Sequence, residues 1–107
     1  MAEVIRALAK FPGHCWFECY IPNTLESLQT FVRGHIETVT FGGCLAVICS
    51  EEGRLLDLPH NCYVDGVDFC GPVLLCGVSG DEFCSVSDDD VKEHLPGTWL
   101  DIVGGEV

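Results

Sequence analysis

The alternation of apolar and polar positions predicts two strands at the start of the chain. Val4 to Ala9 is the first of these segments. Cys15 to Ile21, rich in aromatic residues, is the second, and Pro12-Gly13 supplies the turn between them. We therefore expect the fold to open with two extended segments.

A helix is predicted after the second strand. Asn23 is the expected N-cap, Glu26 completes a capping-box pattern three residues later, and Gly34 supplies the C-terminal stop. Apolar residues recur at positions i, i+3 and i+7, which places them on one face of the helix. The predicted buried stripe consists of Leu25, Leu28 and Val32.

Two more strands are predicted on either side of Gly42-Gly43, from His35 to Phe41 and from Cys44 to Cys49. The two glycines can adopt the positive φ angles of a two-residue hairpin. The second of these strands is apolar throughout, which is typical of a central strand covered on both faces.

The pattern is least regular over residues 54 to 68, where we expect a loop around Leu58-Pro59-His60-Asn61. Phe69 to Val78 then predicts one strand, with Gly71-Pro72 marking a bulge or edge position at its entry.

A short acidic helix is predicted last, from Ser87 with Asp90 three residues later, and ending before Pro96-Gly97. The element order predicts an α+β fold: a single, mostly antiparallel sheet of about five strands, with one main helix packed on it and a short C-terminal helix. A length of 107 residues fits one domain over residues 1–107.

The charge of the chain is strongly unbalanced, with seventeen acidic residues against five Lys and Arg and a formal net charge of −12. Between Asp81 and Glu106, Lys92 is the only Lys or Arg. A field of this sign repels genomic DNA and anionic membranes and favours partners with basic faces. Plain solubility is the alternative explanation of the same charge.

Eight cysteines would form four disulfides in a secreted chain. The N-terminus has no basic region followed by a long apolar one, and no apolar run approaches the roughly 18 residues of a membrane span. We therefore expect a cytoplasmic protein with free thiols that pack as small hydrophobic groups. Because the chain has no Cys-x-x-Cys pair, we expect no metal and no cofactor.

Catalytic motifs are not found in the sequence. His60 and Cys62 are the nearest base and nucleophile along the chain, a proximity that arises readily by chance. The run Asp88-Asp89-Asp90 resembles a divalent-metal site, but acids at a helix N-terminus are also stabilised by the helix dipole. We expect a protein that binds and does not catalyse.

The irregular segment offers a candidate binding surface, since loops often present polar and aromatic groups to a small ligand. Arg54, His60, Asn61 and Tyr63 lie within ten residues of one another there. The alternative is that His60 and Asn61 satisfy the backbone of their own loop.

From Asn23 to Val91 the chain resembles a small family of unknown function encoded by bacteriophages, plasmids and conjugative elements, often of gut bacteria. The segments that carry the resemblance are Thr24 to Gln29, Ile36-Glu37-Thr38-Val39, Glu51 to Leu55, Leu58 to Asn61, Gly71-Pro72, Asp81-Glu82-Phe83 and Ser87-Asp88-Asp89. The resemblance implies an accessory protein of a mobile element, acting in the bacterial cytoplasm, for which countering host defence is one role.

Two functional hypotheses follow. The first is a sponge, possibly homodimeric, that binds and sequesters a nucleotide-derived immune signalling molecule without catalysis. The second is an acidic inhibitor that blocks a basic, nucleic-acid-binding surface of a host defence protein. The predicted ligand-binding residues are Arg54, His60, Asn61, Tyr63, Arg33 and Arg6. The predicted partner face of the second hypothesis is Asp88, Asp89, Asp90 and Glu93.

Overall fold

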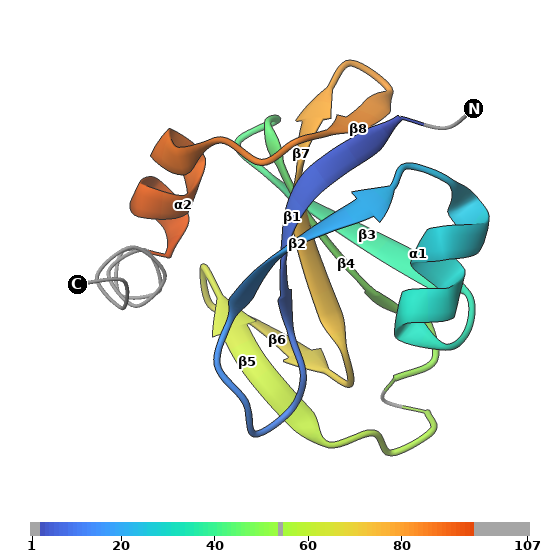
Figure 1. Ribbon diagram of the computed structural model, residues 1–107. Coiled ribbons are helices and arrows are strands. Elements are labelled where there is room, and N and C mark those ends of the chain that lie inside the picture. The colour runs from blue at the N-terminus through green and yellow to red at the C-terminus, as the bar shows by residue number, and fades with distance from the viewer. Residues whose placement is uncertain (1–2, 54, 96–107) are drawn as a thin grey trace.

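The computed structural model of the protein, which describes residues 3–53 and 55–95, has an α+β fold built on an antiparallel sheet (Figure 1). The large sheet has six strands in the order β2-β1-β7-β4-β3, with β8 paired to β7. β5 and β6 form a separate two-stranded sheet. The elements are β1 (Val4–Lys10), β2 (Phe17–Pro22), α1 (Leu25–Val32), β3 (Ile36–Phe41), β4 (Leu45–Ser50), β5 (His60–Val64), β6 (Val67–Cys70), β7 (Val73–Ser79), β8 (Glu82–Cys84) and α2 (Asp88–His94).

The fold class is therefore confirmed, but the predicted single sheet of about five strands is wrong. The large sheet has six strands, and a second sheet of two strands packs beside it. The predicted main helix is also wrong, because α1 has eight residues and α2 has seven. Strands, not helices, supply most of the packing surface.

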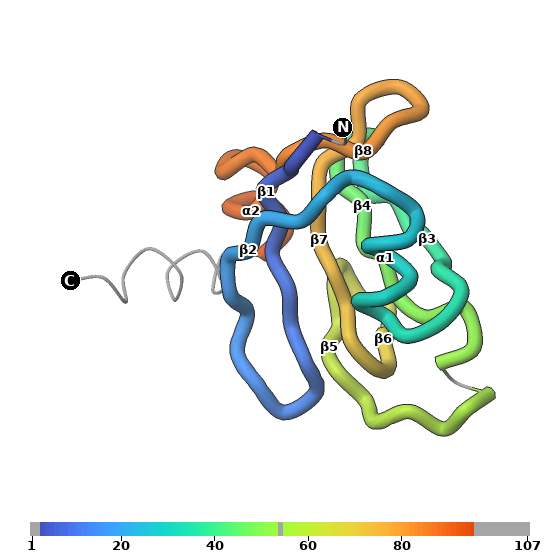
Figure 2. The backbone as a smooth tube through the Cα atoms, turned by 45° about the vertical axis from the view of Figure 1, so that its right-hand side comes forward, coloured from blue at the N-terminus to red at the C-terminus, as the bar shows by residue number. Residues whose placement is uncertain are grey.

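The large sheet is covered on both faces. α1 covers one face (Figure 2), and the β5–β6 hairpin and α2 cover the other. The buried residues on the α1 side are Ile5, Ala7, Ala9, Leu28, Val32, Ala46, Ile48, Leu74 and Cys76. Those on the hairpin side are Leu8, Leu45, Val47, Cys49, Val64, Phe69, Val73, Leu75, Val86 and Val91.

β4 and β7 lie at the centre of the sheet, and their residues alternate between the two apolar clusters. Every residue of β4 is buried, which confirms the prediction of a central strand. An all-apolar strand is stable here because neither of its faces meets water.

The N-cap of α1 is Thr24, not the predicted Asn23. The Thr24 hydroxyl accepts a hydrogen bond from the backbone N–H of Ser27, and the two hydroxyls lie 2.9 Å apart. The Asn23 side chain instead donates to the Phe83 carbonyl at 2.9 Å. Asn23 therefore links the start of α1 to β8. With Thr24 as the N-cap, the third residue of the helix is Ser27, whereas the predicted capping box had Glu26 at that position.

The buried stripe of α1 is partly as predicted. Leu28 and Val32 are each 2% exposed, whereas Leu25 is 58% exposed. Phe31 packs against the α1-side cluster in its place. The helix ends at Val32, and Arg33, not Gly34, adopts the left-handed conformation that terminates it, with φ 62°.

The loop predicted over residues 54 to 68 is wrong for its second half, which forms the β5–β6 hairpin. Val64 pairs with Val67, so the turn contains two residues, Asp65 and Gly66, with φ angles of 47° and 83°. Two consecutive positive φ angles match the right-handed twist of the flanking strands, and Asp-Gly is a favoured sequence for such a turn.

The strand predicted from Phe69 to Val78 is confirmed from Val73 onward as β7, but Gly71 and Pro72 separate Phe69 and Cys70 from it, and these two residues belong to β6. Gly71 has a φ of 76°, and its N–H donates to the Pro59 carbonyl at 2.8 Å. The chain therefore passes from the small sheet to the large one at this point.

β8 is an additional strand that was not predicted. β1 pairs with β7 only as far as Leu75, and β8 pairs along the same edge from Gly77 to Ser79. β4 occupies the opposite edge of β7 over Leu74 to Gly77.

The turn between β3 and β4 is one residue longer than predicted. Gly42 and Gly43 do have positive φ angles, of 62° and 76°. The pairing of Phe41 with Leu45 nevertheless leaves Cys44 in the turn as a third residue.

Candidate functional site

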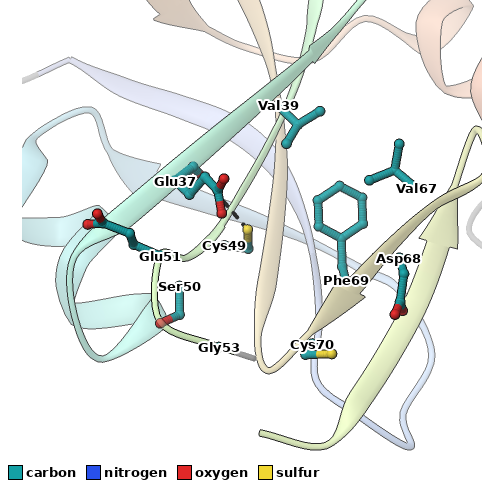
Figure 3. A pocket seen from close by; sticks show the side chains of 10 residues that line it. All are labelled: Glu37, Val39, Cys49, Ser50, Glu51, Gly53, Val67, Asp68, Phe69 and Cys70. Carbon is teal, nitrogen blue, oxygen red and sulfur yellow. Dashed lines mark hydrogen bonds between the residues drawn. The ribbon is translucent and has the colours of Figure 1, made fainter. Parts of the chain in front are cut away.

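The hairpin side of the sheet contains a cleft of about 300 Å³ between β3–β4 and β6 (Figure 3). Val39, Val67 and Phe69 form its apolar wall. Glu37 on β3 and Glu51 after β4 contribute two exposed carboxylates on the β3–β4 side of the cleft, where Val39 also lies and which faces Val67 and Phe69. The cleft is therefore a hollow with an apolar wall and an acidic margin.

Two further exposed carboxylates lie on the same side of the sheet. Asp89 and Glu93 lie on α2, which packs on the same apolar cluster as the β5–β6 hairpin. We call the carboxylates of Glu37, Glu51, Asp89 and Glu93 the acidic face. Among the described residues, no Lys or Arg lies within 4.0 Å of any of these four carboxylates.

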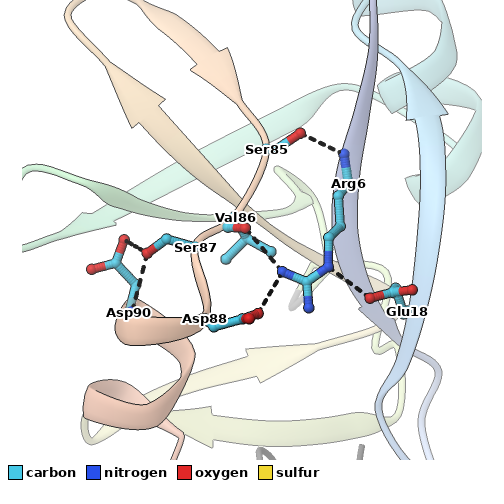
Figure 4. Close-up of polar contacts among 7 residues, drawn as sticks. All are labelled: Arg6, Glu18, Ser85, Val86, Ser87, Asp88 and Asp90. Carbon is cyan, nitrogen blue, oxygen red and sulfur yellow. Dashed lines mark hydrogen bonds and ion pairs between the residues drawn. The ribbon is translucent and has the colours of Figure 1, made fainter. Parts of the chain in front are cut away.

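Arg6 on β1 connects β2 and α2 (Figure 4). Its Nε lies 2.6 Å from a Glu18 carboxylate oxygen, and its Nη1 lies 2.9 Å from Asp88 and 3.0 Å from the Val86 carbonyl. Burial alone lowers the pKa of Arg6, but the hydrogen bonds and charges of Glu18 and Asp88 outweigh burial and raise it. Arg6 therefore binds groups of its own chain through Nε and Nη1.

α2 is held at both ends. Ser87 caps its N-terminus by accepting from the Asp90 N–H, as predicted. Asp90 also accepts from the Cys44 thiol, at 3.3 Å, and from the Ser87 hydroxyl. At the other end, His94 Nδ1 lies 2.5 Å from Asp65 Oδ2. These contacts leave the Asp89 and Glu93 side chains exposed.

The four predicted partner-face residues thus fall into two pairs with different surroundings. Asp88 and Asp90 bind groups of their own chain, through Arg6, Ser87 and Cys44. Asp89 and Glu93 belong to the acidic face.

The predicted ligand-binding residues do not form one cluster. His60 and Tyr63 lie together on β5, with ring centroids 4.8 Å apart, and His60 Nδ1 lies 2.7 Å from Asp68 Oδ1. Arg6 lies under α2, and Arg33 lies at the end of α1. Arg54 lies outside the described residues.

Asn61 is buried and holds the loop before β7. Its Nδ2 donates to the carbonyls of Lys10 and Gly71 at 2.8 and 2.7 Å, and its Oδ1 accepts from Lys10 Nζ at 2.9 Å. The amide therefore satisfies backbone carbonyls of β1 and of the segment between β6 and β7, and not the backbone of its own loop, which the alternative interpretation expected.

A second cavity, of about 310 Å³, lies at the C-terminal end of α1. Its apolar lining includes Phe11, Leu56, Leu58 and Pro72, and Arg33 is a cation on its wall. It is separate from the cleft, although Ser50 contributes to both.

Comparison with known proteins identifies the family of this chain. The profile of a domain of unknown function, DUF3846, matches residues 5–97. The chain is a DUF3846 protein. The resemblance to a family of unknown function is thus confirmed, while the origin in phages and plasmids stays a prediction. No curated protein and no solved structure gives a significant match.

All eight cysteines of the DUF3846 protein are free thiols, as expected. Burial raises the pKa of Cys19, Cys62 and Cys76, the last to about 12. The hydrogen bond to Asp90 raises the pKa of the Cys44 thiol. A raised pKa keeps a thiol protonated, which makes it a poor nucleophile.

Glu37 and Glu51 were not predicted as site residues in this family member. They are distant in sequence from the acidic segment after Asp81, and the cleft between them and β6 exists only because the hairpin packs on the sheet. A correct prediction of the Asp65-Gly66 turn would have indicated the second sheet, but not its position.

Among the residues that the structure describes, neither α1 nor α2 of the DUF3846 protein is long and apolar enough to cross a bilayer.

Proposed function

We propose that the DUF3846 protein is a non-catalytic binding protein whose acidic face docks on a basic surface of a protein partner. The observation that carries the proposal is the arrangement of charge. Four carboxylates from the cleft and α2 lie on one side of the sheet without a Lys or Arg partner among the described residues.

The cations of the chain strengthen this asymmetry, because two of them are used internally. Arg6 binds Glu18 and Asp88, and Lys10 binds the side chain and the carbonyl of Asn61. The formal charge of −12 is therefore poorly compensated at the surface. The negative potential of such a surface accelerates association with a basic partner, and this effect weakens as salt is added.

The second support is preorganisation. α2 is fixed through Asp88, Asp90 and His94, so Asp89 and Glu93 project from a helix that does not have to be ordered on binding. A preorganised surface avoids part of the entropy loss of association. The raised thiol pKa values of Cys44, Cys62 and Cys76 are consistent with a protein that does not use a cysteine nucleophile.

In its cellular setting, the proposal retains the inhibitor hypothesis. The protein would be an accessory protein of a phage or mobile element, and its acidic face would compete with nucleic acid for a basic surface of a host defence protein. The face proposed here differs from the predicted one, because Glu37 and Glu51 replace Asp88 and Asp90.

The test uses a fluorescein-labelled deca-arginine peptide as a basic probe, with binding followed by anisotropy. The face variants are Glu37→Lys/Glu51→Lys and Asp89→Lys/Glu93→Lys. The matched control is Glu26→Lys/Glu82→Lys, which changes the net charge equally at exposed positions outside the acidic face.

We expect each face variant to bind the probe about tenfold more weakly, and the control to change binding less than about threefold. Added salt should weaken the wild-type complex in the same experiment. Equal loss in all three variants would show that net charge alone attracts the probe, and would overturn the proposal of a defined face.

A second candidate function is the sequestration of a small nucleotide-derived molecule, favoured by the cavity that Arg33 adjoins. Native mass spectrometry of the protein with cyclic dinucleotides or ADP-ribose tests it. A retained molecule that is released intact on heating supports a sponge. Release of a cleaved product would identify an enzyme, and no retained molecule would contradict this candidate for these two ligand classes.

A further inference from the structure

The cavity at the end of α1 combines an apolar surface with one positive charge. Phe11 and Leu56 are 40% and 57% exposed although both are large apolar side chains. With Leu58 and Pro72 they surround a space of about 310 Å³. This volume is at the lower end of the range found for small-molecule sites.

The Phe11 ring is a fixed part of this wall. Its centroid lies 5.4 Å from that of Phe31 and 6.0 Å from that of Phe17, and the ring pair with Phe17 is stacked. Aromatic neighbours at these separations stabilise one another. A flat ligand would therefore meet a surface that is already in place.

Arg33 occupies a backbone position that normally favours glycine. It is the C-cap of α1, with φ 62° and ψ 47°, and its N–H donates to the Gln29 carbonyl. A residue with a side chain costs about 1 kcal/mol or more in this left-handed conformation. Such a local cost is often associated with a functional side chain.

The guanidinium of Arg33 also differs from that of Arg6 in its surroundings. Arg6 binds two carboxylates, whereas no carboxylate among the described residues lies within 4.0 Å of Arg33. In a chain of formal charge −12, an arginine that lines an apolar cavity and has no carboxylate partner in the described part of the chain is complementary to an anionic ligand.

We infer that this cavity binds a small ligand with a flat apolar body and a single anionic group, either a carboxylate or a phosphate. The apolar body lies against Phe11, Leu56 and Leu58, and the anionic group binds the Arg33 guanidinium. This inference goes beyond both candidate functions, because its ligand carries one anionic group and not the two phosphates of a cyclic dinucleotide or ADP-ribose, and it is independent of the acidic face.

The test compares two dyes that share an aromatic body. 8-Anilinonaphthalene-1-sulfonate carries one negative charge, and N-phenyl-1-naphthylamine carries none. Fluorescence titrations are made with the wild type, with Arg33→Asn, which tolerates the left-handed conformation, and with Arg33→Lys, which keeps the charge. Thermal melting shows whether each variant is folded.

We expect Arg33→Asn to bind the anionic dye about tenfold more weakly and the neutral dye with unchanged affinity. Arg33→Lys should retain most of the affinity for the anionic dye. Amide shifts in a ¹⁵N-labelled protein should change at Ser50, Leu56 and Leu58 on addition of the anionic dye. Competition by 1-naphthoate and by 1-naphthyl phosphate then distinguishes a carboxylate ligand from a phosphate ligand.

The inference is overturned if Arg33→Asn binds both dyes as the wild type does, or if the amide shifts lie away from this cavity. Neither result would affect the proposed acidic face, because the deca-arginine measurements use different residues. A nucleotide retained in native mass spectrometry together with unchanged dye binding would place the sponge site elsewhere.

Discussion

The imidazole of His94 and the carboxylate of Asp65 lie 2.5 Å apart and join the C-terminal end of α2 to the tip of the β5–β6 hairpin. The His94 side chain is 13% exposed and its ring centroid lies 6.2 Å from that of Phe41. The contact therefore connects three elements: the acidic helix, the small sheet and the turn region of β3.

This contact predicts an energetic coupling between the two residues. We expect His94→Gln and Asp65→Asn each to lower the free energy of unfolding by about 1 kcal/mol, and the double variant to lose about 0.5–1.5 kcal/mol less than the sum. Asn is chosen because Asp65 has a positive φ, which Asn tolerates. Urea unfolding of the four proteins measures the coupling, and additive losses would show that the two residues act separately.

A second prediction concerns Gly77, where β7, β8 and the following segment approach closely. A Cβ at this position would lie 2.6 Å from the Ser85 carbonyl oxygen and 2.9 Å from the Cys84 sulfur. Because backbone cannot move away as an exposed side chain can, we expect Gly77→Ala to cost about 2–3 kcal/mol in urea unfolding.

Gly34→Ala is the matched control for Gly77→Ala. Gly34 has no positive φ, and a Cβ there would lie 3.9 Å from the nearest atom, the Ser50 Oγ. We expect the control to be neutral or slightly stabilising, since alanine reduces the entropy of the unfolded chain. Equal effects of the two substitutions would contradict the close approach of β8 to β7.

The strands with long, regular patterns were predictable from sequence. The pairs β1–β2 and β3–β4 are local, and the apolar run of β4 indicated its central place. The strands after Gly53 were harder to predict, because apolar and polar residues alternate irregularly along the β5–β6 hairpin. The pairing of its strands also contains a register shift between His60 and Cys62. Its Asp65-Gly66 turn was a usable signal that the sequence analysis missed.

The candidate site was less predictable than the fold. Arg6 and Arg33 are the same residue type, and the sequence does not distinguish them. In the folded protein, however, Arg6 binds Glu18 and Asp88, whereas Arg33 lies beside a cavity. Sequence spacing contains no information about either outcome, because the partners of Arg6 lie 12 and 82 positions away along the chain.

The last prediction follows from Cys76, which is fully buried on the α1 side of the sheet. Burial, with a smaller contribution from Cys84, raises its pKa from 9.0 to about 12. At pH values between these two pKa values, the unfolded chain loses the thiol proton while the folded protein keeps it. The free energy of unfolding therefore decreases as pH rises, by at most about 1.4 kcal/mol per pH unit for one proton.

We expect urea unfolding at pH 8, 9 and 10 to show a steeper loss of stability in the wild type than in Cys76→Ala, which has no thiol to titrate. Cys15→Ala, at an exposed cysteine, serves as the control and should follow the wild type. Parallel pH profiles for all three proteins would show that the Cys76 thiol titrates alike in the folded and unfolded states.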